Sequence, residues 1–232
     1  AHIATLRSRV PFVNSHDGFR TSHELQKIQV FPKAVYKRVM QLLQPEIDAH
    51  RQRGLNPNHP HIRGTAQCED IYFQAVENSN QYYLKVPAYV EEAFQWVEKL
   101  CGRKYDLFEY VGSKRAKYVV VIMGSGSGAV EEYLDHTKNS DYGLVKVRLF
   151  RPWSLKHFLA ALPMATLKAV AVCNKMKEAA AMGEPLFMDV CASLQQAGST
   201  AAVLNGRFGL SSKDLTPGMV EAVFNNLKAP EP

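Results

Sequence analysis

The sequence predicts an α/β fold, a three-layer sandwich whose sheet is mostly parallel. From about Tyr82 onward, segments with helical periodicity alternate with short runs of β-branched residues. The run 118–123 (YVVVIM) is apolar throughout, which is typical of a strand buried on both faces of a parallel sheet. Strand and helix alternate at a spacing that favours a doubly wound arrangement, with helices on both faces of the sheet.

The first 81 residues lack this alternation. The run 10–13 (VPFV) predicts a short strand, and Ser22 predicts the start of a helix that continues through Glu24. Residues 32–49 predict one longer helix. It is expected to end before the run 51–60, which is rich in Gly, Asn and Pro and cannot continue a helix.

The elements of the α/β region follow in order. Apolar residues recur at helical spacing from Val90 to Cys101, and Gly102 follows as a C-cap. Thr216 and Pro217 predict the N-cap and first turn of the last helix. Besides 118–123, the expected strands are 144–150, 169–173 and 201–204, and the expected helices are 130–138, 155–162, 186–196 and 216–227. Residues 105–110 fit either a strand or a connecting turn.

Composition and charge exclude several classes of protein. The apolar fraction is 46%, yet no apolar run approaches the ~20 residues of a membrane span, and the N-terminus lacks the apolar region of a signal peptide. The net charge is +6, but the basic residues are interleaved with acidic ones and no nucleic-acid-binding signature occurs. The four cysteines form no C-x-x-C pair, so neither an iron–sulfur cluster nor a zinc site is indicated. Reduced, buried thiols in an intracellular protein are expected instead.

A glycine-rich loop follows the 118–123 strand and leaves two interpretations open. Gly124, Gly126 and Ala129 satisfy G-x-G-x-x-A, the fingerprint of a dinucleotide site. The next strand ends without the acidic residue that binds ribose hydroxyls, although Arg148 and Arg151 would suit the 2′-phosphate of NADP. Alternatively, the glycines allow the loop, strand and helix to pack closely. We favour close packing and keep a free-standing NADP-binding module as the alternative.

Histidines raise the question of a metal site. His59 and His61 stand two apart in a loop, but no third Cys, Asp or Glu has a matching position, so loop hydrogen bonding is the favoured interpretation.

Charged side chains near the N-terminus predict ion pairs. Asp17, Arg20 and Glu24 fit one buried or interface salt-bridge set. Arg20 and Arg63 could each bind a carboxylate bidentately. We favour a carboxylate of the protein over one of a substrate, and the candidates are Glu24, Glu69 and Asp70.

Two irregular runs carry the most specific signal. Residues 16–28 read HDGFRTSHELQKI, and residues 56–74 read NPNHPHIRGTAQCEDIYFQ, with neither a helical nor a strand period. They resemble the phrases "DGFRTSHE.QKI" and "HPHIRGTAQN.D.YFQ" of the pyruvate:ferredoxin (flavodoxin) oxidoreductase family, which includes pyruvate:NADP oxidoreductases. Further motifs extend the resemblance almost end to end, among them GLVKVRLFRPWS and NGRFGLSSKDLTP.

The resemblance implies that the chain is one segment of a larger enzyme. Residues 1–30 would end its thiamine-associated first domain, 31–81 would form a connecting helix and the irregular RGTAQ loop, and 82–228 would form a domain like the C-terminal domain of transketolases. The implied parent converts pyruvate and CoA to acetyl-CoA, carbon dioxide and two electrons, using thiamine diphosphate, magnesium and iron–sulfur clusters.

The same resemblance implies the partners. They are other domains of the same polypeptide, a second subunit in a homodimer, and ferredoxin, flavodoxin or NADP as electron acceptor. Neither nucleic acid nor membrane is expected, and the location is expected to be the cytoplasm or an organelle of anaerobic metabolism.

The family's thiamine- and pyruvate-binding residues lie in other stretches, so we assign no catalytic residue, metal ligand or bound cofactor to this segment, which is expected to be structural and inactive alone. Cys68 stands where the family usually has Asn, and residues 174–178 (NKMKE) replace the usual D-R-T-K-E. The remaining candidates for cofactor contact are Arg63, Gly64, Thr65, Gln67, Gly124 and Gly126.

Overall fold

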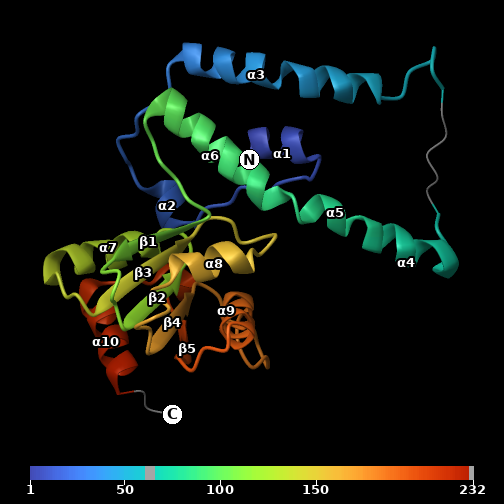
Figure 1. Cartoon of the computed structure of the whole chain (residues 1–232). Coiled ribbons are helices and arrows are strands. Elements are labelled where there is room, and N and C mark those ends of the chain that lie inside the picture. Colours follow the sequence, from blue (N-terminus) through green and yellow to red (C-terminus); the bar gives the residue numbers. More distant parts are fainter. Residues whose placement is uncertain (61–65, 230–232) are drawn as a thin grey trace. The chain divides into compact units, whose positions relative to one another are not determined.

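The computed structural model describes residues 1–60 and 66–229 (Figure 1). The chain divides into two compact units. Unit 1 comprises Ala1–Asn14 and Lys27–Tyr105, and unit 2 comprises Ser15–Gln26 and Asp106–Pro232. The chain therefore passes from one unit to the other three times.

Unit 2 is built on one five-stranded sheet in the order β1-β3-β2-β4-β5. Its strands are β1 (Phe108–Gly112), β2 (Tyr118–Ile122), β3 (Tyr142–Val147), β4 (Ala169–Asn174) and β5 (Ala202–Arg207). Strands β2 to β5 pair in parallel, and β1 pairs with β3 in the antiparallel direction. The predicted α/β fold with a mostly parallel sheet is confirmed, and the ambiguous run near Tyr105 leads into an antiparallel edge strand.

Helices cover both faces of this sheet (Figure 1). They are α7 (Gly126–Thr137), α8 (Leu155–Ala161), α9 (Pro185–Gln196) and α10 (Pro217–Lys228). On one face, Val120 and Ile122 of β2 pack with Val130 of α7 and Phe224 of α10. Because side chains alternate along a strand, Val119 faces the other side, where α8 contacts β1 and α9 contacts β4 and β5. The central strands are apolar on both faces because both faces are covered.

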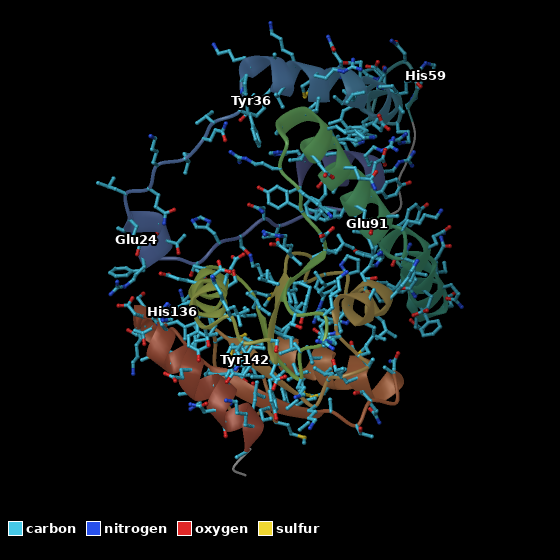
Figure 2. All side chains as sticks on the ribbon, turned by 60° about the vertical axis from the view of Figure 1, so that its left-hand side comes forward. Glu24, Tyr36, His59, Glu91, His136 and Tyr142 are labelled. Carbon is cyan, nitrogen blue, oxygen red and sulfur yellow. The ribbon has the colours of Figure 1, made fainter. Side chains whose placement is uncertain are left out.

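The core of unit 2 contains an aromatic stack. The rings of Tyr142 and Phe224 lie 4.1 Å apart, and Tyr133 stacks on Phe224 at 5.8 Å. Figure 2 shows Tyr142 within this unit. The side chain of Thr216 accepts a hydrogen bond from the backbone N–H of Met219, which confirms the predicted N-cap of α10.

Unit 1 is helical. It contains α1 (His2–Ser8), α3 (Lys33–Gln52), α4 (Glu69–Asn78), α5 (Asn80–Tyr83) and α6 (Val86–Cys101). Helix α1 packs against α3 and α6, and Leu43 of α3 and Val86 of α6 are buried. The guanidinium of Arg7 joins the three helices, because it donates to Glu46 of α3 and to Glu92 of α6. Helix α6 ends at Gly102 in the left-handed conformation, as predicted.

Two predictions for the N-terminal region are wrong. Residues 10–13 form no strand, since Pro11 lacks an N–H for a ladder and Val13 is 92% exposed. Helix α2 (Arg20–His23) is a single turn that ends before Glu24 instead of continuing beyond it. Glu24, the residue that follows α2, is exposed (Figure 2).

The run 56–74 also differs from the prediction, because α4 begins inside it at Glu69. Its apolar residues follow one another instead of recurring on one face, and the helix buries none of them. Glu69 and Asp70 in the first turn are the one local signal of a helix start. Helix α7 begins at Gly126, four residues before the predicted start, and β3 ends at Val147, three residues early. In the described parts of the chain, no helix combines the length and apolar character needed to cross a bilayer.

Candidate functional site

The carboxyl ends of β2, β4 and β5 lie at one edge of the sheet. The chain leaves β2 at Gly124 and enters α7, whereas it leaves β4 at Lys175 and continues towards α9. Strands β2 and β4 are neighbours, but α7 and α9 cover opposite faces of the sheet. This edge is therefore the point where the strand order reverses, the usual position of ligands in open α/β folds.

The carboxylate of Asp17 occupies this position. It accepts a hydrogen bond from the backbone N–H of Ser125, and the Nζ atom of Lys175 lies 3.7 Å from its other oxygen. Asp17 therefore links the loop after β2 to the loop after β4. Its side chain is 14% exposed, so the charge is well shielded from water.

The environment of Asp17 favours its charged form. Burial alone would raise the pKa of this carboxyl. Hydrogen bonds from Ser125 and the positive charge of Lys175 outweigh burial and hold the pKa below its ordinary value of 3.8. Asp17 is consequently a carboxylate at neutral pH, and it meets the positive end of the α7 dipole.

The glycines of the loop fit this arrangement. Gly124 has a φ of +77°, and a Cβ atom there would lie 2.7 Å from Oδ2 of Asp17. A Cβ atom on Gly126 would lie 2.6 Å from the ring of Phe208. A Cβ atom on Gly128 would have no neighbouring atom within 4 Å. Two of the three glycines thus allow close packing, which supports the interpretation favoured from the sequence.

The arginines considered for a 2′-phosphate bind carboxylates of the protein. Arg148 donates through Nε to Glu109 at 2.9 Å. Arg151 donates to Asp189 at 2.7 Å. With Asp17 bonded to the loop N–H, these contacts count against a dinucleotide at this edge.

The predicted salt-bridge set of Asp17, Arg20 and Glu24 is wrong in its pairing. Arg20 binds Asp214, with 3.0 Å between Nη1 and Oδ1. Its partner is a carboxylate of the protein, as expected, but not one of the proposed candidates. Spacing along one segment suggested local pairs, whereas the actual partners come from the loops after β2, β4 and η1 (Leu210–Ser212).

The remaining candidates fall elsewhere. Arg63, Gly64 and Thr65, together with His61, lie outside the described residues. Gln67 is exposed and belongs to unit 1, whereas Gly124 and Gly126 belong to unit 2. No cluster of three His, Cys, Asp or Glu suited to a metal ion occurs within residues 1–60 and 66–229.

A buried carboxylate near the same edge was not predicted from the sequence. Glu184, the N-cap residue of α9, is fully buried and accepts hydrogen bonds from Arg207 and Asn205 of β5. The backbone N–H of Glu178 donates to it at 3.3 Å. The hydrogen bond from Arg207 outweighs burial and lowers the pKa of Glu184 to about 2. The only local signal is a Glu directly before the Pro that opens a helix, and that signal does not indicate a partner.

Comparison with known proteins identifies the family. The model described as "Pyruvate flavodoxin/ferredoxin oxidoreductase, thiamine diP-bdg" matches residues 1–95, and "Pyruvate:ferredoxin oxidoreductase core domain II" matches residues 116–220. The chain belongs to the pyruvate:ferredoxin/flavodoxin oxidoreductase family. The resemblance read from the two irregular runs is thereby confirmed.

Relatives in this family match the whole chain. It is 49% identical to the pyruvate:ferredoxin oxidoreductase of Moorella thermoacetica and 45% identical to a probable pyruvate-flavodoxin oxidoreductase of Escherichia coli, and spans 20% of each. It is 42% identical to the pyruvate dehydrogenase [NADP(+)] of Cryptosporidium parvum, of which it spans 12%. A 2-oxoglutarate:ferredoxin oxidoreductase structure from Magnetococcus marinus aligns with 74% of this chain and 27% of its own, at 16% identity and a TM-score of 0.43.

Proposed function

We propose that this chain is a structural and interface segment of a thiamine-diphosphate-dependent 2-oxo acid oxidoreductase. The parent would convert pyruvate and CoA to acetyl-CoA, carbon dioxide and two electrons, with magnesium and iron–sulfur clusters as further cofactors. The observation that carries the proposal is the end-to-end match to pyruvate oxidoreductases of which the chain spans only about a fifth. Ferredoxin, flavodoxin or NADP would accept the electrons, since relatives carry all three names.

The candidate edge supports a structural role. Near this edge, two carboxylates bind cations of the same chain: Asp17 binds Lys175, and Glu184 binds Arg207. Such pairs hold loops together. Neither pair places a nucleophilic side chain beside an unpaired base, which nucleophilic catalysis requires. We therefore propose that the chemistry of the parent resides in its other domains. The RGTAQ loop, with Arg63, Gly64, Thr65 and Gln67, is a candidate for contact with a cofactor or domain of the parent.

Helix α4 supports an interface role. It buries no residue, and Ile71, Tyr72 and Phe73 are each more than half exposed. Contiguous exposed apolar side chains mark surfaces that another protein surface covers. The helix also carries acidic residues in its first turn and no basic residue in its last turn. The other domains of the parent, or a second subunit, would meet it with an apolar, partly basic surface.

The proposal extends to fold and location. We propose that residues 82–228 adopt the fold of a transketolase C-terminal domain, preceded by the end of the thiamine domain (1–30) and a connecting region (31–81). The parent would act inside the cell, in the cytoplasm or in an organelle; the relative from Euglena gracilis is named as mitochondrial.

Assays of the pure chain test the inactivity. Pyruvate decarboxylation would be measured with thiamine diphosphate, magnesium and CoA present, and calorimetric titration would follow NADP, CoA and thiamine diphosphate separately. We expect no turnover and no saturable heat. Turnover by the pure chain would contradict the proposal, and saturable NADP binding that is lost in Gly126→Val would instead support the nucleotide-binding alternative.

A further inference from the structure

The segment Ser15–Gln26, here named the strap, leaves unit 1 after Asn14 and rejoins it at Lys27, yet it packs with unit 2. Only Asp17 and Thr21 within it are not exposed. Its two large apolar side chains, Phe19 and Leu25, are 66% and 103% exposed. The strap is therefore not held by burial of apolar surface, the usual means of fixing a segment.

Polar contacts hold the strap instead. Asp17 binds Ser125 and Lys175, and Arg20 binds Asp214. The side chains of Arg20 and Asp214 are each more than half exposed, so this ion pair contributes little to holding the strap. Asp17 is the principal anchor, because its carboxylate is the shielded one and bonds to a backbone N–H as well as to a cation.

The receiving surface is shaped around this carboxylate. Gly124 has no side chain and a positive φ, so the loop can approach Asp17 closely. On the other side, Gly209 also has a positive φ, +66°, and a Cβ atom there would lie 3.0 Å from Cε of Lys175. Gly209 thus gives Lys175 the room to reach Asp17. Loops after three different strands contribute to one carboxylate-binding site.

The strap is bound in a strained conformation. Phe19 has a φ of +56° and a ψ of −88°, a combination outside the αL region that a bulky residue rarely adopts. Such strain costs on the order of 1–3 kcal/mol and persists only when neighbouring contacts enforce it. The carbonyl oxygen of Phe19 accepts hydrogen bonds from Oγ of Ser22 and the backbone N–H of His23, so contacts within the strap hold this conformation together with those of Asp17 and Arg20.

We propose that the reversal point of the sheet is a carboxylate-binding site whose ligand is the chain's own strap, and that the strap docks there reversibly with Asp17 as its anchor. The strap thus occupies the position at which open α/β folds usually bind a ligand. When the strap is docked, the backbone N–H of Ser125 and the Nζ atom of Lys175 both contact Asp17. When it is released, residues 15–26 become a flexible connection and both groups lose this partner.

Exchange and proteolysis of the intact chain test this inference. Trypsin cleaves after Arg20 only when the strap is free to enter the protease, and amide exchange at Ser125 reports its hydrogen bond to Asp17. Asp17→Asn removes the charge at constant size, and Glu24→Gln removes the same charge from an exposed site in the strap. We expect the rate of cleavage after Arg20 and the rate of amide exchange at Ser125 to rise about tenfold or more in Asp17→Asn. Both rates should stay at the wild-type value in Glu24→Gln.

Salt provides a test without substitution. Raising the salt concentration from about 0.1 M to 1 M shortens the Debye length from about 10 Å to about 3 Å. Cleavage at Arg20 is expected to rise with salt in the wild type and to be nearly independent of salt in Asp17→Asn. Lys175→Met should act in the same direction as Asp17→Asn, and the double variant should add little to either. Equal cleavage and exchange in wild type, Asp17→Asn and Glu24→Gln, with unchanged thermal unfolding, would overturn the inference.

Discussion

The carboxylate of Asp17 accepts a hydrogen bond from the backbone N–H of Ser125, 108 positions further along the chain. This contact joins the two motifs that stand out in the sequence, the DGFRTSHE run and the glycine-rich loop. Each motif has a separate local interpretation. Together they form the two halves of one site, and the glycine pattern reflects the approach of a carboxylate from the same chain.

Gly126→Ala is expected to destabilise the protein, because the added methyl group meets the ring of Phe208 and the side chain of Ile122 at 2.6–2.9 Å. Overpacking of this kind costs roughly 1–3 kcal/mol. Gly128→Ala is the matched control in the same helix, where a Cβ atom has no neighbour within 4 Å. It should stabilise by up to about 1 kcal/mol through helix propensity. Urea unfolding of both variants measures the difference, and equal effects would contradict the packing role of Gly126.

Acid should weaken the protein through Glu184. Its pKa of about 2 lies below the ordinary 4.5, so its contacts with Arg207 and Asn205 contribute stability that is fully present above pH 4.5. This contribution is lost as the pH falls from 4.5 towards 2. Urea unfolding at pH 6, 4 and 3 should show this loss in the wild type and a smaller one in Glu184→Gln. Glu178→Gln, which changes an exposed neighbour, should keep the wild-type profile.

Phe224→Ala should cost about 3–5 kcal/mol, because it leaves a cavity beside Tyr142 and Tyr133 and removes both stacking contacts. Phe73→Ala on α4 removes the same group from a site that is 68% exposed and should change the free energy of unfolding by less than about 0.5 kcal/mol. Chemical denaturation with fluorescence detection distinguishes the two. A large loss in Phe73→Ala would mean that α4 is packed in solution.

Arg7→Met should loosen unit 1. The guanidinium donates to Glu46 and Glu92, and one oxygen of Glu46 is already buried without a hydrogen-bond partner. Loss of hydrogen bonds to charged groups costs roughly 1.5–3 kcal/mol. Amide exchange in α1 should therefore accelerate, while exchange in β2 stays unchanged. Arg9→Met changes an exposed neighbour just past α1 and serves as the control.

The sequence predicted the sheet and most helices of unit 2 because local patterns determine them. The β-branched run of β2 and the Thr-Pro start of α10 suffice without knowledge of their neighbours. The strand predicted at residues 10–13 was wrong, because the prediction relied on apolar composition although Pro11 has no N–H for a ladder hydrogen bond. The prediction also failed for α4, since a helix that buries none of its residues shows no apolar period.

The candidate site was only half predictable. The residue types at Asp17, Arg20 and Gly124 indicated charge pairing and close approach. Their partners could not be inferred, because Lys175 and Asp214 reach them only after the sheet has formed. Glu184 was missed for the same reason, as its donors lie on β5, beyond the whole of α9.

The order in which the chain is synthesised has a consequence for the strap. Asp17 leaves the ribosome 108 residues before Ser125, which at ~5–20 residues per second is a delay of roughly 5–20 seconds. Until the loops after β2 and β4 exist, the strap has no surface to dock on. The docking site is completed only after Lys175 has been synthesised, so the strap must remain unattached while the sheet assembles. Chaperones that bind short apolar segments would encounter it during that interval.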